Sequence, residues 1–452
     1  MLKKMNNKEN TTIRPIHYLG SKLRMLDTIK QAVDYVDASH GCVCDLFSGS
    51  GTVSRYLSSY RDVIAADIQM YSSVLCEATM TWMDCGIGSE DIVEKIINGK
   101  TRKKLKRSFG KLLEYEQTCI EKAKNDEIDA LYEIIEKGSI YIYQKEGNAG
   151  CTTGLRDQLD HIRDALQMKN EAEDLDSIIT RYYGGLYFSY SQAIDLDCIE
   201  HYVFENSGLM KVKLLAALLS TTSEIVNTVG KQFAQPLKVR DSKGGYKKSL
   251  KKKILDDRSL SVFDIFGKWL DHYFTAGEKI HKHRVICDDY KTVLHDLANS
   301  DVKVVYADPP YTRYHYSRYY HVLETICLRD NPIITTTFPN GTGGISRAIY
   351  REGRHQSPFC IKSQAEKAFE ELFIGVRALN VPLVLSYSPF EPGQAVTPRL
   401  QTIDQLIEKA KIFFSDVSTM SPGEFTHSKL NATDKNFESN HEAEMLIICR
   451  NR

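Results

Sequence analysis

Residues 42–54, CVCDLFSGSGTVS, pass from a short apolar run into a glycine-containing turn and then into a segment with helical character. A continuous apolar run is typical of a strand that is covered on both faces of a parallel sheet. Gly49 and Gly51 allow the backbone to turn sharply and to approach a ligand closely. This stretch therefore predicts a strand, a turn and a helix of an α/β sheet, with a ligand site at the turn.

Further apolar runs have the character of buried parallel strands; they lie at 63–67, 284–288, 302–308, 382–388, 411–417 and 445–449. Helical segments lie between several of them, at 52–60, 290–297 and 364–379. Strands that alternate with helices indicate an open, doubly wound α/β sheet. We therefore expect seven strands in one sheet, with a ligand bound at their carboxyl ends.

The interval 68–283 is too long for an ordinary connection between two strands of a compact domain. It is rich in helical patterns, including 209–229, and Gly230 is suited to end that helix. The polar and aromatic residues at 184–197 and 230–237 suit either a DNA-facing surface or a helical core. We predict three parts: the first part of a catalytic domain at 1–90, a mainly helical inserted domain at 91–280, and the second part of the catalytic domain at 281–452.

Charge is balanced over the whole chain, with 59 basic and 59 acidic residues, so the net charge gives no signal for nucleic acid. Two local runs are basic, KTRKKLKR at 100–107 and KGGYKKSLKKK at 243–253. A basic run is often only a solvated face, but two runs within one inserted segment favour a surface that contacts phosphates. The candidate DNA contacts from these runs are Lys103, Lys104, Lys247 and Lys248.

The composition is that of a soluble globular protein, with 42% hydrophobic and 26% charged residues. No apolar run is long enough to predict a membrane span, and the first residues, MLKKMNNKENTTIRP, lack the apolar stretch of a signal peptide. The eleven cysteines include no CxxC pair, which favours buried free thiols over a zinc site. We expect a cytoplasmic protein with no membrane contact and no metal.

An acid at the end of the second predicted strand extends the ligand site. Asp67 ends the run VIAAD, where a carboxylate can accept hydrogen bonds from both hydroxyls of a ribose. With the glycine turn it predicts a nucleoside pocket. No GxxxxGK[ST] motif is present, so the expected cofactor lacks a phosphate chain, and S-adenosylmethionine fits. Asp45 would then face the cationic amino-acid end of the cofactor, and Phe47 would pack near its adenosine.

The residues Asp308-Pro309-Pro310-Tyr311 follow the apolar run 302–307. Two prolines cannot pair in a sheet and their bulk excludes a helix, so these residues form a rigid turn at a strand end. The Asp308 carboxylate and the Pro309 carbonyl could accept both hydrogens of an exocyclic base amine and aim its lone pair at a methyl group. Tyr311 offers a ring on which a flipped base can stack. The turn therefore favours methyl transfer to a base.

These motifs, in this order, resemble those of the adenine-N6 DNA methyltransferases of the DNA adenine methylase family. HYLGSK at 17–22 is similar to the family's N-terminal cofactor motif, DLFSGSG at 45–51 to its glycine motif, and VICDDY at 285–290 to its third-strand motif. The resemblance implies the following cofactor contacts: Tyr18, Lys22, Asp45, Phe47, Gly49, Gly51, Asp67, Asp289 and Tyr290. Asp288 is an adjacent alternative to Asp289. The catalytic turn would consist of Asp308, Pro309, Pro310 and Tyr311.

The resemblance also implies a Rossmann-like methyltransferase sheet, S-adenosylmethionine as methyl donor and double-stranded DNA as partner, with target recognition in the long insertion. Such enzymes work in restriction-modification or phage defence, where a partner protein is possible; no feature of the sequence indicates an oligomeric state. Asp308 as the first residue of the turn points to adenine, whereas serine would favour cytosine N4 and asparagine a protein glutamine. The alternatives are an RNA adenine or cytosine-N4 methyltransferase, or a nucleic-acid-binding protein with this fold.

A dense aromatic and basic cluster, TRYHYSRYYHVLETI at 312–326, follows the turn directly. We expect some of Arg313, His315, Tyr316 and Arg318 to hold the backbone of a flipped adenine, and we count the two arginines as DNA contacts. Residues 319–326 have the spacing of an amphipathic core helix. Further on, 331–356 is rich in Thr, Gly and Arg, which suits an exposed loop near a polyanion.

Overall fold

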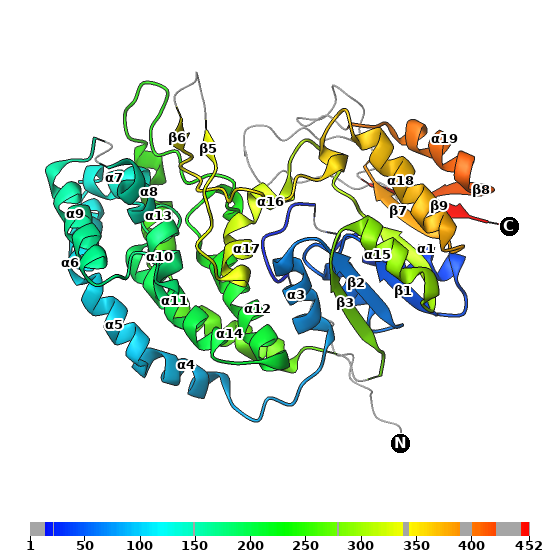
Figure 1. Cartoon of the computed structure of the whole chain (residues 1–452), viewed down its shortest axis with the longest axis horizontal. Coiled ribbons are helices and arrows are strands. Elements are labelled where there is room, and N and C mark those ends of the chain that lie inside the picture. Colours follow the sequence, from blue (N-terminus) through cyan, green and yellow to red (C-terminus); the bar gives the residue numbers. More distant parts are fainter. Residues whose placement is uncertain are drawn as a thin grey trace.

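The structure is a computed structural model, which describes residues 14–20, 22–147, 150–277, 280–337, 343–388, 400–421 and 444–451. Figure 1 shows two parts side by side: a sheet with its helices on the right, and a group of helices on the left. The first residues of the chain, Ser21 of the HYLGSK motif and 338–342 of the expected loop lie outside the described residues. None of the helices in the described part of the chain is long and apolar enough to cross a membrane.

One seven-stranded sheet has the order β3-β2-β1-β4-β7-β9-β8. Its strands are β1 (Cys42–Asp45), β2 (Val63–Asp67), β3 (His283–Cys287), β4 (Val302–Ala307), β7 (Leu383–Tyr387), β8 (Asp416–Met420) and β9 (Met445–Arg450). β1 lies at the centre and pairs in parallel with both β2 and β4. The predicted α/β sheet and its number of strands are therefore confirmed.

Two of the predicted strands differ from the expectation. β9 runs antiparallel to both of its neighbours, β7 and β8, although 445–449 was expected to be a parallel strand. The run 411–417 was also placed too early, because its first residues complete helix α19 (Ile403–Phe413) and β8 begins at Asp416. Thr402 and Gln405 start α19 with reciprocal hydrogen bonds between side chain and backbone, and buried Leu406 and Ala410 lie one helical turn apart.

Helices cover both faces of the sheet, as a doubly wound fold requires. One face packs against α1 (Leu26–Val36), α2 (Thr52–Leu57) and α3 (Met70–Met80), and the other against α15 (Tyr290–Asp296), α18 (Ala365–Ala378) and α19. Neighbouring residues of β1 alternate between these two cores: Val43 belongs to the first and Cys44 to the second. Both are completely buried, which explains the continuous apolar run.

The left part of the molecule consists of helices that lie between α3 and β3 in the sequence. They are α4 (Ser89–Asn98), α5 (Lys100–Ser108), α6 (Gly110–Lys124), α7 (Asp129–Lys137), α8 (Ile140–Glu146), α9 (Thr153–Met168), α10 (Ile178–Tyr183), α11 (Tyr190–Phe204), α12 (Gly208–Ile225), α13 (Lys251–Arg258) and α14 (Val262–Thr275). The expected helix at 209–229 ends earlier than predicted, because the Tyr187 carbonyl accepts the backbone N–H of Asn227. Gly230 instead lies in a short 3-10 turn at a φ of 72°.

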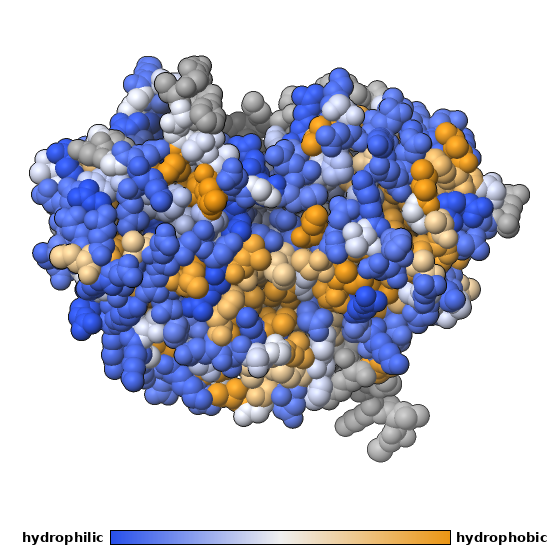
Figure 2. All heavy atoms as spheres, viewed as in Figure 1, coloured by the Kyte–Doolittle hydropathy of each residue, from blue (hydrophilic) through white to orange (hydrophobic). Residues whose placement is uncertain are grey.

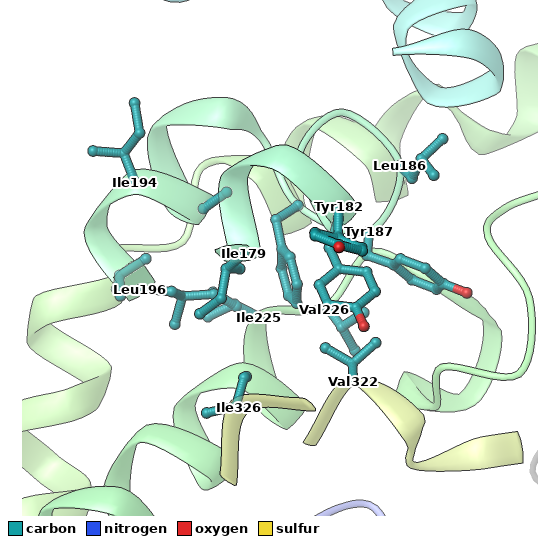
Figure 3. Packing of buried hydrophobic residues seen from close by; sticks show 14 of the residues in the cluster. Ile179, Tyr182, Leu186, Tyr187, Ile194, Leu196, Ile225, Val226, Val322 and Ile326 are labelled. Carbon is teal, nitrogen blue, oxygen red and sulfur yellow. The ribbon is translucent and has the colours of Figure 1, made fainter. Parts of the chain in front are cut away.

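The helical part shares its hydrophobic core with helix α3, which packs on the sheet, and with helix α17 (His321–Leu328). Figure 3 shows Val322 and Ile326 of α17 in one cluster with Ile179 and Tyr182 of α10 and with Leu186 and Tyr187, which follow α10. Of the two readings of 184–197, the core is the correct one, since Tyr187 and Phe188 are completely buried. The expected helix at 319–326 is present but divided, with α16 (Tyr316–Tyr319) preceding α17.

Lys213 on α12 is a polar link between the two parts. Its buried ammonium donates to the carbonyls of Ala78 at 3.2 Å, Tyr273 at 2.6 Å and Ala276 at 3.1 Å. Those carbonyls belong to the last turn of α3 and to the end of α14, where helices leave acceptors without partners. Lys213 therefore fastens the helical part to a helix that packs on the sheet.

The segment 331–356 was expected to be an exposed loop, but part of it is buried. It forms a short hairpin of β5 (Thr336–Thr337) and β6 (Gly344–Ile345), but Ile349 is completely buried in the core of the helical part. Tyr350 is also buried, and its hydroxyl donates to the Ala234 carbonyl. The cysteines are all free, and all are buried except Cys85 and Cys287, as the sequence predicted.

Candidate active site

A pocket that is partly open to solvent lies at the carboxyl ends of β1, β2 and β4. It brings together most of the residues predicted as cofactor-binding or catalytic: Tyr18, Lys22, Asp45, Phe47, Gly49, Asp67, Asp289, Tyr290, Asp308 and Pro310. Gly51, Pro309 and Tyr311 adjoin these residues in the sequence without lining the pocket themselves. Its lining combines aromatic rings with acidic and polar groups, as the binding sites of small molecules commonly do.

The glycine turn after β1 needs both of its glycines. Gly49 has a φ of 54°, and a Cβ at this position would lie 2.6 Å from the Tyr18 hydroxyl. Gly51 has a φ of 75° as the residue before α2, and a Cβ there would lie 3.0 Å from the Cys76 sulfur. L-residues with side chains rarely adopt such backbone angles. The turn can therefore pass close to a ligand only with glycine at these positions.

Asp67, at the end of β2, is held by the backbone of two neighbouring segments. One carboxylate oxygen accepts the N–H of Gly49 at 2.9 Å and the other accepts that of Gln69, also at 2.9 Å. Burial raises the pKa of Asp67, while these hydrogen bonds favour the carboxylate. Each oxygen has a second lone pair that can accept a hydroxyl. The carboxylate therefore has a fixed position suited to a ribose.

Aromatic rings form two walls of the pocket. Tyr18 stacks on Tyr316 and Tyr320, with ring centroids 5.3 Å and 5.1 Å away. On the other wall, Phe47 and Tyr290 meet Phe359 at 5.5 Å and 5.3 Å. Flat apolar walls of this kind suit a purine.

Two details of the second wall refine the sequence prediction. The Tyr290 hydroxyl donates to the Glu371 carboxylate at 3.3 Å, so only the ring of Tyr290 serves the pocket. Asp289, the residue before α15, accepts the N–H of Lys291 at 3.0 Å, and Asp288 is more exposed; both line the pocket. The choice between these two acids as cofactor contact stays a prediction.

Several pocket residues were missed from the sequence. His355, Ser357, Pro358 and Phe359 line the pocket from a segment around the short 3-10 turn Pro358–Cys360, and Gln69 lines it from the start of α3. The segment has neither a motif nor a regular apolar spacing, so no sequence signal could have placed it here.

The DPPY turn is tied to the N-terminal motif by an ion pair. Lys22 lies 2.9 Å from one oxygen of Asp308, and its ammonium also contacts Glu444. The other oxygen of Asp308 is buried and has no hydrogen-bond partner among the described residues. Tyr311 packs against Tyr387 with ring centroids 5.1 Å apart, and its hydroxyl donates to Glu444 at 3.3 Å.

Glu444 was missed because of the error in strand direction. It directly precedes β9, and a parallel strand would begin at the edge of the sheet opposite the pocket. Since β9 is antiparallel, its first residues lie at the carboxyl edge of β4 and β7, where the pocket is.

The charges of the pocket favour a ligand with a positive charge and with hydrogen-bond donors. Burial raises the pKa of Asp308 to about 6 and that of Asp45 to about 7. The pKa of Lys22 lies well above its usual value, because Asp308 and Glu444 outweigh the effect of burial. Buried polar atoms without a described partner line the pocket: Oδ1 of Asp45, Oε1 of Gln69, the Tyr306 hydroxyl and Oδ1 of Asp308.

The basic runs of the helical part do not lie at this pocket. α5 follows the lower left side of Figure 1, and Figure 2 shows that this side of the molecule is largely hydrophilic. Lys103 is exposed there, while Lys104 pairs with Asp174 at 2.6 Å. In the second run, Lys248 is exposed and Lys247 donates to the Lys238 carbonyl at 3.0 Å.

Arginines that follow the DPPY turn do lie near the pocket. Arg313 is exposed, and Arg318 donates to the Tyr350 hydroxyl at 2.8 Å. The guanidinium of Arg354 lies 5.1 Å from the centre of the same tyrosine ring, as does that of Arg318. Ser317 and His355, beside these arginines in sequence, both line the pocket. A second basic segment, 350–355, thus lies beside the predicted one that contains Arg313 and Arg318.

Comparison with known proteins gives a consistent picture. The family model of D12 class N6 adenine-specific DNA methyltransferases matches residues 18–154 and 269–338. The chain is 24% identical over 440 residues to modification methylase LlaI of Lactococcus lactis subsp. lactis, covering 96% of this chain and 55% of that protein. It is 23% identical to the type II methyltransferase M.NlaIII of Neisseria lactamica, covering 79% of each chain.

A third relative is modification methylase StsI of Streptococcus sanguinis, 22% identical over 82% of this chain and 44% of that protein. The chain therefore spans about half the length of LlaI and StsI. No solved structure gives a significant match. The residues that match the model of the D12 class N6 adenine-specific DNA methyltransferases include the glycine turn, Asp67 and the DPPY turn, so the similarity covers the main parts of the pocket.

Proposed function

We propose that this protein is a site-specific DNA adenine-N6 methyltransferase that moves the methyl group of S-adenosylmethionine to the exocyclic amine of an adenine flipped out of the duplex. The observation that carries the proposal is the position of Asp308. Asp308 lines the same pocket as Gly49 and Asp67, one of its oxygens has no partner among the described residues, and it stands on a turn made rigid by two prolines. The relatives' names, modification methylases and a type II methyltransferase, support a restriction-modification setting.

The pocket fits the proposed cofactor, which when bound supplies a methyl group already activated by a positively charged sulfur. Asp67 would accept the ribose hydroxyls, and the wall of Phe47, Tyr290 and Phe359 would hold the adenine ring. Asp45 would face the positively charged end, with its unpartnered oxygen as acceptor. The donors of the cofactor thus match the acceptors that the pocket leaves free.

The DPPY turn would orient the base amine. The free oxygen of Asp308 would accept one N–H and the Pro309 carbonyl the other, so that the nitrogen lone pair points at the methyl group. Asp308 must be ionised to accept, and with its pKa at about 6 it is mostly ionised at neutral pH. Tyr311, held by Tyr387 and Glu444, remains the candidate ring for stacking of the flipped base.

DNA would approach from the side of the basic segments 313–318 and 350–355. Arg313, which is exposed, and Arg318 and Arg354, which lie against the Tyr350 ring, would contact backbone phosphates beside the flipped nucleotide. We further propose that the helices from α4 to α14, within the predicted inserted domain at 91–280, deliver the recognition sequence to the pocket.

The test is to express the protein in a host and to map N6-methyladenine in the host DNA by long-read sequencing. Motif-specific methylation is expected from the wild type. Asp308→Ala should lose it, by roughly a hundredfold or more in rate, because an oriented polar group in an active site is typically worth that much. The matched control is Asp301→Ala, which changes an exposed aspartate at the opposite end of β4 and should methylate as the wild type does.

Each outcome has one meaning. Wild-type protein that is expressed and folded but leaves no motif-specific N6-methyladenine contradicts the proposed function. Methylation by Asp308→Ala at the wild-type rate contradicts the role of the turn and leaves the function standing.

A further inference from the structure

We propose that Glu444 is a positioning residue for the reaction: acting through Lys22, it fixes the orientation and the charge of Asp308. The inference rests on the proposed function and deepens it. Glu444 precedes β9 and lies outside the segments that the family model matches, 18–154 and 269–338. The family model therefore assigns it no role.

The geometry consists of one ammonium between two carboxylates. The Lys22 side chain is only 6% exposed and contacts Asp308 at 2.9 Å on one side and Glu444 on the other. A lysine held at two points cannot rotate freely, so the oxygen of Asp308 that it binds is fixed. The other oxygen of Asp308 does not bind Lys22 and has no partner among the described residues, so it is available to accept a hydrogen bond from the base amine.

Tyr311 completes the arrangement from the other side of the turn. Its hydroxyl donates to the same oxygen of Glu444 that contacts Lys22, at 3.3 Å. Glu444 thus joins the first and the last residue of the DPPY turn through Lys22 and Tyr311. This connection restrains the turn beyond what its prolines do, and precise placement of reacting groups is where an active site gains rate.

Charge gives Glu444 its second effect. A lysine and a single carboxylate would form a neutral pair, whereas Lys22 with Asp308 and Glu444 carries one net negative charge. In the proposed reaction a positive charge develops on the amine nitrogen beside Asp308. A fixed negative charge in a site shielded from water stabilises that change more than a neutral pair would.

The two neighbours of Asp308 act on its protonation in opposite directions. Burial raises the pKa of Asp308, Lys22 lowers it and Glu444 raises it. Among the described residues Asp45 is a further acid whose charge interacts with that of Asp308, and the phenols of Tyr306 and Tyr316 stay neutral because burial raises their pKa values. Asp45 is unchanged in variants of the other two groups, so a difference between such variants reports on Lys22 and Glu444.

The experiment measures kcat/KM against pH on a duplex that contains the target sequence found by methylation mapping. The acidic limb of the wild-type profile reports protonation of the free enzyme's essential acid and is expected near pH 6. Glu444→Gln removes the negative charge, so the limb should move to lower pH, by about one unit, while the plateau falls by roughly tenfold. Lys22→Met removes the positive charge, so its limb should move to higher pH.

Opposite shifts are the result that a merely structural role cannot give. Loss of packing or stability would lower the plateau of both variants without moving their limbs in opposite directions. An acidic limb of Glu444→Gln that stays at the wild-type position, or moves to higher pH, overturns the inference.

The controls separate failure of this inference from failure of the proposed function. If the wild type methylates no DNA at any pH, the proposed function is contradicted. If the wild type methylates DNA but the acidic limb of Glu444→Gln does not move, only the inference about Glu444 is contradicted. If Glu444→Gln does not fold, as judged by its thermal midpoint, Glu444→Asp decides. That variant keeps the charge but moves it one methylene from Lys22, so its limb should move to lower pH by less than one unit; an unmoved limb overturns the inference.

Discussion

Two basic regions of this protein differ in what their cations contact. Helix α5 is the more basic in sequence, yet Arg102 pairs with Asp195 at 2.8 Å and Lys104 pairs with Asp174 at 2.6 Å. The segments that follow the DPPY turn hold fewer cations, but Arg318 and Arg354 lie against a tyrosine ring. Within the described residues neither of these arginines has a carboxylate partner. A count of the cations in a sequence is therefore a poor predictor of a phosphate-binding surface. It is more informative to know whether the carboxylates of the same protein already pair with those cations.

The largest effect is expected when both arginines beside the pocket are replaced by neutral residues. The double variant Arg318→Gln, Arg354→Gln should bind target duplex about tenfold to a hundredfold more weakly, since hydrogen bonds to charged groups are worth about 1.5–3 kcal/mol each and are not additive here. Fluorescence anisotropy at several salt concentrations measures the effect. The slope of log K against log salt should become shallower by about 0.9 for each phosphate that the variant no longer neutralises. Unchanged affinity and slope would remove the DNA-facing role of this region.

A smaller effect is expected for Lys103→Gln on α5, which should change the affinity for DNA by less than about twofold. An exposed cation far from the bound DNA interacts with the phosphates only weakly, because salt screens the interaction. The side chain is exposed, so the substitution leaves the fold intact. The same anisotropy titration serves for both variants. If Lys103→Gln weakens binding as much as the double arginine variant does, the DNA surface extends as far as the exposed side of α5, and the two basic regions do not differ in function.

The smallest effect is expected for Lys104→Gln, which removes a cation that already has partners. It should lower the free energy of unfolding by about 0.2–1 kcal/mol, as for other ion pairs near a surface, and leave DNA affinity unchanged. Urea denaturation measures the change, with Lys103→Gln as the matched control. A drop in DNA affinity without a drop in stability would show that Lys104 exchanges Asp174 for phosphate when DNA binds.

The parts of the molecule that the sequence predicts well depend on local patterns. The run 42–44 is apolar because both faces of β1 are covered, and Gly49 and Gly51 are glycines because their backbone angles and their neighbours demand it. The contacts of Asp67 with the glycine turn follow from the order of β1 and β2 in the sheet. A few residues were thus enough to locate the pocket.

The parts that escaped prediction depend on contacts between distant segments. An apolar run such as 445–449 predicts a strand but carries no information about its direction, so Glu444 was assigned to no site. Phe359 reaches the pocket from a segment without periodicity. Lys104 and Asp174 are seventy residues apart, and only the packing of the helices shows that they neutralise each other.

The place of β9 in the sheet also bears on how the protein matures. β7 and β8 are both synthesised before β9, yet β9 lies between them. Until residues 444–450 have left the ribosome, β7 therefore presents an open edge, β8 has no neighbour, and Lys22 lacks its second carboxylate. Completion of the pocket would consequently wait for this strand, and a chain interrupted before it would lack both the strand and the second carboxylate beside Lys22.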